Sequence, residues 1–122
     1  MYVNNNYPDS VKYVNIEAGL GRIRGNKNLY KRMLGMFLAS GEFAKLEDAI
    51  TSGDGTAASD VAHAIKGMSG NLSLDDVFRL SETLMIKFRE DDFDDAIISE
   101  FRESLKITLE IVEDVCNNYL AG

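Results

Sequence analysis

The stretch that decides the fold is Thr56-Ala57-Ala58-Ser59-Asp60-Val61-Ala62-His63-Ala64-Ile65-Lys66-Gly67-Met68-Ser69-Gly70-Asn71-Leu72. Its apolar residues recur at intervals of three and four, which is the spacing of one helical face. Thr56 is a suitable N-cap, and the apolar face consists of Ala58, Val61, Ala62, Ile65, Met68 and Leu72. The stretch therefore predicts an amphipathic helix that carries the chain's only histidine, His63, beside its apolar face.

The same helical spacing recurs on both sides of this stretch. Asn15 is placed to cap a short helix that ends near Gly25, and Asn26 is placed to cap the next one. Ser40-Gly41 marks a break between two apolar stripes, and further stripes occupy residues 77–88 and 97–115. The only proline is Pro8, so all of the chain after it is free to be helical.

These segments predict an all-α fold, an antiparallel up-and-down four-helix bundle with a short additional N-terminal helix packed across one end. We expect residues 1–14 to form a polar N-terminal arm and residues 15–122 to form the bundle domain. The length of 122 residues is that of one domain with one core.

The charge balance excludes some classes of partner. A formal net charge of −7 and the lack of a basic block argue against nucleic acid, whose binders carry a basic surface. No apolar run approaches the ~20 residues of a membrane span, and the N-terminus does not resemble a signal peptide. The single Cys116, spaced as part of a core face, is expected to be a buried, inert thiol. We expect a monomeric, cytoplasmic protein or domain that binds neither nucleic acid nor membrane.

His63 has distinctive neighbours at helical spacing. Lys66, Gly67 and Gly70 follow it by three, four and seven residues, so they share its face and surround it with one cation and little bulk. A surface histidine without a role, a core histidine, a metal ligand and a general base oriented by Asp60 are the alternatives. The metal interpretation is disfavoured because the chain has no second histidine and only one distant cysteine.

A phosphoryl-accepting histidine accounts for these neighbours best. A neutral imidazole is a competent nucleophile near neutral pH, and Lys66 is placed to pair with the charge that a phosphoryl group adds. Each glycine in a helix costs roughly 1 kcal/mol relative to alanine, so Gly67 and Gly70 need a reason. The functional reason is close approach of a partner. The structural alternatives are close helix packing or, at Gly70-Asn71, a loosened helix end.

The segment from Ala62 to Leu72 resembles the signature of histidine-containing phosphotransfer (HPt) domains: histidine, any residue, leucine or similar, lysine, glycine. The segments Gly19–Tyr30 and Met33–Leu38 also resemble the N-terminal part of that family. The resemblance implies that His63 exchanges a phosphoryl group with receiver-domain aspartates, that Lys66 stabilises this group and that Gly67 gives access. It also implies that the divalent metal belongs to the partner, so the chain itself needs no cofactor or metal and has no kinase or hydrolase activity.

The chain departs from the family pattern in two respects. Ser73 stands where many members have a glycine. Many members also place an amide side chain near the histidine from the next helix, where this chain offers Thr83, Met85, Ile86 and Lys87.

The expected partners are receiver domains of response regulators or of hybrid sensor kinases. We expect them to dock on the helix pair that carries His63 and Met85, over an apolar patch of Phe78 and Met85 beside Gly70. Ser59 and Asp60 would rim this patch. The alternatives are that Phe78 and Met85 are partly buried core, and that the bundle is a docking or regulatory module without phosphotransfer.

Overall fold

The computed structural model describes residues 1–121, which form helices and no strands, so the all-α class is confirmed. The elements in chain order are the 3-10 helix η1 (Ser10–Lys12), α1 (Ile16–Gly21), α2 (Lys27–Leu38), α3 (Glu42–Ser52), α4 (Gly55–Leu72), α5 (Asp75–Arg89), α6 (Asp95–Asp114) and the π-helical turn η2 (Val115–Tyr119). The break expected at Ser40-Gly41 separates α2 from α3.

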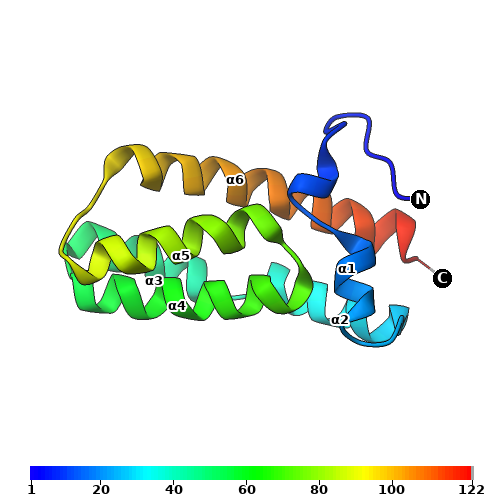
Figure 1. Ribbon diagram of the computed structural model, residues 1–122, viewed down its shortest axis with the longest axis horizontal. Coiled ribbons are helices and arrows are strands. Elements are labelled where there is room, and N and C mark those ends of the chain that lie inside the picture. The colour runs from blue at the N-terminus through cyan, green and yellow to red at the C-terminus, as the bar shows by residue number, and fades with distance from the viewer. Residues whose placement is uncertain (122) are drawn as a thin grey trace.

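Three helices, α4, α5 and α6, run along the long axis of the molecule (Figure 1). The most extensive packing joins α4 to α5, while α3 packs on α4 and α6 packs on α5. The short connections at the two ends reverse the chain between α4 and α5 and again between α5 and α6. The short α1 contacts α2 and α4 at the end of the molecule where both termini lie. None of the described helices has the length and hydropathy needed to cross a membrane.

Side-chain caps fix where the helices begin. Asn15 and Asn26 accept hydrogen bonds from the backbone N–H groups of Ala18 (3.2 Å) and Leu29 (3.0 Å), as predicted. The cap predicted at Thr56 was wrong, because Asp54 caps α4 by accepting from Ala57 N at 3.0 Å. The helix begins earlier at Gly55, where a Cβ would lie only 2.5 Å from the carbonyl oxygen of Phe88.

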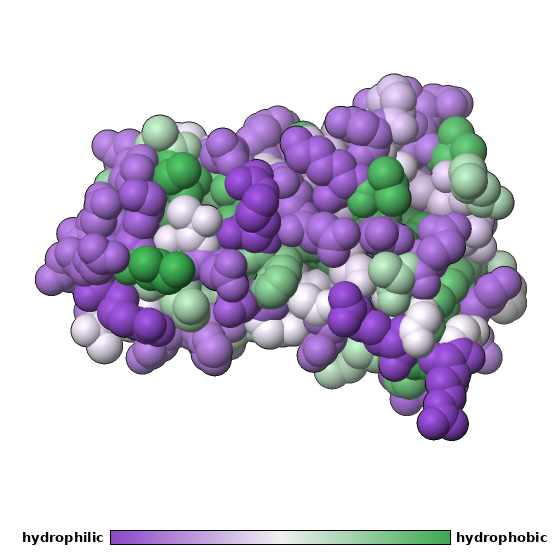
Figure 2. All heavy atoms as spheres, viewed as in Figure 1, coloured by the Kyte–Doolittle hydropathy of each residue, from purple (hydrophilic) through white to green (hydrophobic). Residues whose placement is uncertain are grey.

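The core consists of two buried clusters, one near the termini and one at the opposite half of the bundle. On α4 the predicted face is buried at Ala58, Ala62, Ile65 and Leu72, while Val61 and Met68 are only partly buried. Cys116 is buried as expected, and burial raises the pKa of its thiol. Figure 2 shows hydrophobic residues on one face as separate small patches among hydrophilic side chains.

Residues 1–14, expected to form a polar arm, pack against the C-terminal helices. The Tyr2 hydroxyl donates to Asp114 at 2.6 Å, the Tyr7 hydroxyl donates to Glu110, and Val14 is buried in the core. Burial and the neighbouring Asp114 carboxylate raise the pKa of Tyr2 to about 12. These contacts place three residues of the segment directly on the bundle, while the proposed boundary at residue 15 stays a prediction.

Candidate functional site

The face of α4 that carries His63 lies against α5 in antiparallel register. His63 is opposite Met85, Lys66 is opposite Glu82, and Gly70 is opposite Phe78. The number on α5 falls as the number on α4 rises, so each turn of α4 meets one turn of α5. This register decides which side chains of α5 can act on the histidine.

The His63 residue is exposed, and one nitrogen of its ring contacts α5. Nδ1 lies 3.3 Å from the sulfur of Met85, whose side chain is buried. A thioether has no proton to donate, so this contact is a hydrogen bond only when Nδ1 carries the ring proton. Nε2 then has a free lone pair. Because residue 63 as a whole is exposed, this lone pair is available to a group that approaches from outside.

Lys66 lies where its helical spacing predicted, one turn from His63, but it has a partner in the resting chain. Its Nζ lies 3.0 Å from Glu82 Oε2 and 5.7 Å from the centre of the Phe78 ring. The exposed fraction of the Lys66 side chain is 24% and that of Glu82 is 51%. The sequence identified the cation, but it did not identify the carboxylate that pairs with it.

The two glycines on this face are not explained by helix packing. A Cβ on Gly67 would meet no described atom within 4 Å beyond its neighbours in the chain and the nearby backbone of its own helix. A Cβ on Gly70 would meet only the Phe78 ring, at 3.7 Å, which is ordinary van der Waals contact. Alanine would therefore fit at either position within the described chain. What the glycines provide is open space beside the imidazole.

This face borders a hollow of about 380 Å³, lined by Arg22, His63, Lys66, Gly67, Gly70, Asn71, Asp75 and Phe78. Arg22 comes from the end of α1, and its Nε donates to Ser73 Oγ at 3.1 Å. Ser73 itself caps α4 with a left-handed φ of 58°, a conformation that glycine adopts without strain. Burial raises the pKa of Asp75, and the nearby Arg22 guanidinium opposes this shift.

The residues expected to form the docking patch and its rim differ in their exposure. Ser59 is buried and donates to the Met85 carbonyl at 2.9 Å, so its predicted place on the rim was wrong. It lies on the side of α4 that α5 covers. Met85 is also buried, as the core alternative held, but it contacts His63 directly. Phe78 is partly buried in the hollow, and Asp60 is exposed one turn before His63.

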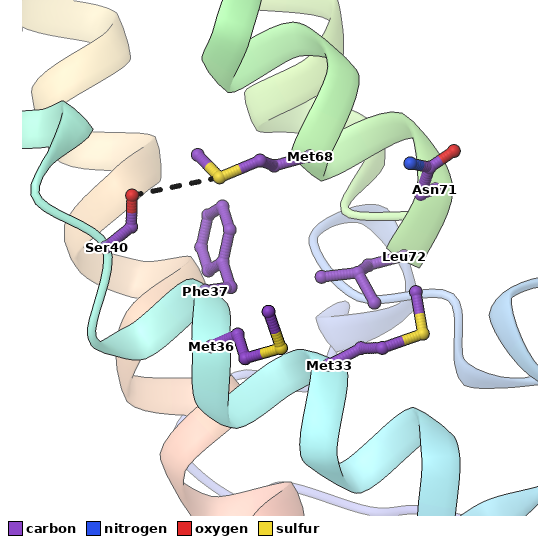
Figure 3. A pocket seen from close by; sticks show the side chains of 7 residues that line it. All are labelled: Met33, Met36, Phe37, Ser40, Met68, Asn71 and Leu72. Carbon is purple, nitrogen blue, oxygen red and sulfur yellow. Dashed lines mark hydrogen bonds between the residues drawn. The ribbon is translucent and has the colours of Figure 1, made fainter.

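A second hollow, of about 280 Å³, lies between α2 and α4. Figure 3 shows Met33, Met36 and Phe37 projecting from α2 toward Met68 and Leu72 of α4. The lining is completed by Ser40, whose hydroxyl lies 3.7 Å from the Met68 sulfur, and by Asn71. Asn71 lines both hollows, so the methionine-lined hollow and the one at His63 meet at this residue. Among the methionines that line this hollow, Met36 is 68% exposed, whereas Met33 and Met68 are partly buried.

The model of one protein family, the Hpt domain, matches residues 32–114. This match covers more than half of the chain and includes all of α3, α4 and α5. The chain belongs to the Hpt domain family. Searches of curated proteins and of solved structures find no significant match. Hpt domains are phosphocarrier modules of two-component signalling, and as a family they interact with receiver domains. Within residues 1–121, no three histidine, cysteine or acidic side chains come together as a metal site.

Proposed function

We propose that this Hpt domain carries a phosphoryl group on Nε2 of His63 in a multistep phosphorelay, receiving it from one receiver aspartate and passing it to another. The observation that carries the proposal is the position of the ring: Nδ1 faces Met85, and His63 borders the same hollow as Lys66 and Gly67. Membership of the family supports the same role. The platform would be the up-and-down four-helix bundle expected from the sequence.

The transfer step involves one bond made and one broken. The lone pair on Nε2 forms a bond to phosphorus while the bond from phosphorus to the aspartate oxygen breaks, and its electron pair leaves on the carboxylate. The ring keeps the Nδ1 proton and carries a positive charge until that proton leaves. The return step, to a second receiver aspartate, reverses these changes.

Two neighbours of His63 would assist the transfer, one by its positive charge and one by its lack of a side chain. Lys66 would stabilise the phosphoryl oxygens, and Gly67 would let the receiver approach the ring. The divalent metal would be supplied by the receiver, so the chain would need no cofactor and would have no kinase or hydrolase activity of its own. Its contribution is a positioned nucleophile on a rigid helix.

The receiver would dock across both hollows. The hollow at His63 presents Lys66 and Arg22, whose positive charge suits an acidic phosphorylation site. The methionine-lined hollow beyond Asn71 presents an apolar surface, and methionine adapts its shape to different partners. A charged rim beside an apolar anchor is typical of a transient interface.

The test is transfer of label from a phosphorylated receiver in the presence of a divalent metal. The wild-type chain is expected to take up label that is lost in acid and stable in alkali, as expected for a phosphohistidine. His63→Gln should take up none while its free energy of unfolding stays within ~0.5 kcal/mol of the wild type, because residue 63 is exposed. A wild-type chain that binds receivers but takes label from none of them would instead be a docking module.

A further inference from the structure

The cation beside His63 is already engaged in the resting chain. Lys66 Nζ is 3.0 Å from Glu82 Oε2, and Glu82 comes from α5 rather than from the helix that carries the histidine. Met85, which holds the ring, lies three residues further along the same helix. Glu82 is therefore about one helical turn from the side chain that fixes the nucleophile.

We infer that Glu82 competes with the phosphoryl group for Lys66 and thereby sets how far the transfer equilibrium lies toward phosphorylated His63. This inference rests on the proposed function. In it Glu82 is a positioning residue, because it acts through Lys66 and does not touch the transferred group. By pairing with Lys66, Glu82 lowers the fraction of His63 that is phosphorylated at equilibrium.

The phosphoryl group and Glu82 compete for the same cation. A phosphoryl group adds about 1.5 to 2 negative charges, and Glu82 holds the Lys66 ammonium that would otherwise pair with that charge. Lysine has a flexible stem and three N–H donors, so Lys66 is able to turn from Glu82 toward a group on His63. Phosphorylation of His63 would weaken the ion pair between Lys66 and Glu82. The free energy lost from this pair would shift the transfer equilibrium toward the receiver.

The size of the effect follows from the exposure of the pair. Glu82 is 51% exposed and Lys66 24% exposed, so water screens their attraction in part. Exposed pairs of this kind change equilibria by about two- to fivefold. The equilibrium constant should therefore shift by this amount when the carboxylate is removed, and the bundle should stay folded.

The experiment measures the phosphoryl distribution between a receiver and the chain at equilibrium. Glu82→Gln should shift it about two- to fivefold toward the chain, and Glu82→Asp, which keeps the charge, should restore the wild-type value. Glu100→Gln is the matched control, because Glu100 pairs with Arg79 at 3.2 Å on an exposed surface and changes the net charge equally. In a Lys66→Ala background, Glu82→Gln should have less than half of its effect.

The outcomes separate this inference from the proposed function. If the wild type takes up no label, the proposed function fails first. If the wild type is labelled but Glu82→Gln leaves the equilibrium unchanged or shifts it toward the receiver, only the role of Glu82 is overturned. An equal shift in Glu100→Gln would also overturn it, because the shift would then follow from the net charge of the chain. An undiminished shift in the Lys66→Ala background would overturn it too, because Glu82 would then act without Lys66.

Discussion

His63 Nδ1 and the sulfur of Met85 lie 3.3 Å apart and join the imidazole of α4 to a buried side chain of α5. The contact holds one edge of the ring against α5. It is a hydrogen bond only in the tautomer whose free lone pair is on Nε2. The sequence offers Thr83, Met85, Ile86 and Lys87 in the region where the resemblance places an amide near the histidine, and the structure places the Met85 thioether beside the ring.

This contact predicts the tautomer of the resting histidine. Two-bond ¹H–¹⁵N spectra should show Nδ1 protonated and Nε2 bare, and after phosphorylation the phosphorus should be on Nε2. Met85→Leu keeps the volume, costs less than about 1.5 kcal/mol, and removes the sulfur acceptor, so the Nε2–H tautomer should gain population. A resting ring protonated on Nε2 in the wild type would contradict the assignment.

The substitution Gly67→Ala should change the stability of the chain and its rate of phosphoryl transfer in opposite directions. Alanine there meets open space within the described chain and has the higher helix propensity, so Gly67→Ala should raise the free energy of unfolding by up to about 1 kcal/mol. It should slow phosphoryl transfer, because its methyl group stands where a partner must approach. Gly35→Ala in α2 is the control, since its Cβ also meets open space within residues 1–121 and it should stabilise without slowing transfer. Equal transfer rates in the two variants would remove Gly67 from the site.

Sequence reasoning predicts the part of the candidate site that one helix carries. His63, Lys66 and Gly67 share a face because their spacing on a single helix fixes it, whatever the rest of the fold does. Glu82 and Arg22 depend on how α5 and α1 lie against α4, and sequence spacing within one helix contains no such information. Ser59 was misplaced for the same reason, since only the packing of α5 shows that its side of α4 is covered.

The methionine-lined hollow was missed because its residues looked like ordinary core. Met33, Phe37 and Met68 have the spacing of inward faces, and Phe37 is indeed buried. The hollow lies between α2 and α4, where Met33 and Met68 are only partly buried and Met36 is exposed. Helix periodicity alone does not report such partly uncovered side chains.

Acid sensitivity should depend on the start of α6. Asp94 Oδ1 accepts from Ala96 N (3.1 Å) and Ile97 N (3.2 Å), and Oδ2 lies 3.3 Å from Lys87 Nζ. The Ile97 N–H first, and then Lys87, lower the pKa of Asp94. A lowered folded pKa contributes stability above the unfolded value of about 3.9, and this contribution is lost as the pH falls through the folded value.

Asp94→Asn, which still caps the helix, should therefore flatten the fall in stability below pH about 4. Denaturant unfolding from pH 2 to 6 measures this slope. An unchanged slope in the variant would show that other carboxyls carry the acid response.

Docking should depend on the most exposed methionine of the second hollow. Met36 is 68% exposed on α2, so Met36→Gln should leave the free energy of unfolding within ~0.5 kcal/mol of the wild type. The loss of an apolar anchor should raise the Kd for the receiver about tenfold, which corresponds to about 1.4 kcal/mol. The transfer rate at saturating receiver should stay the same, because Met36 lines the hollow beyond Asn71 and not the one at His63.

Val11→Gln is the matched control, since Val11 is 59% exposed but lies outside both hollows. An equal loss of affinity in both variants, or none in Met36→Gln, would place the receiver elsewhere on the bundle.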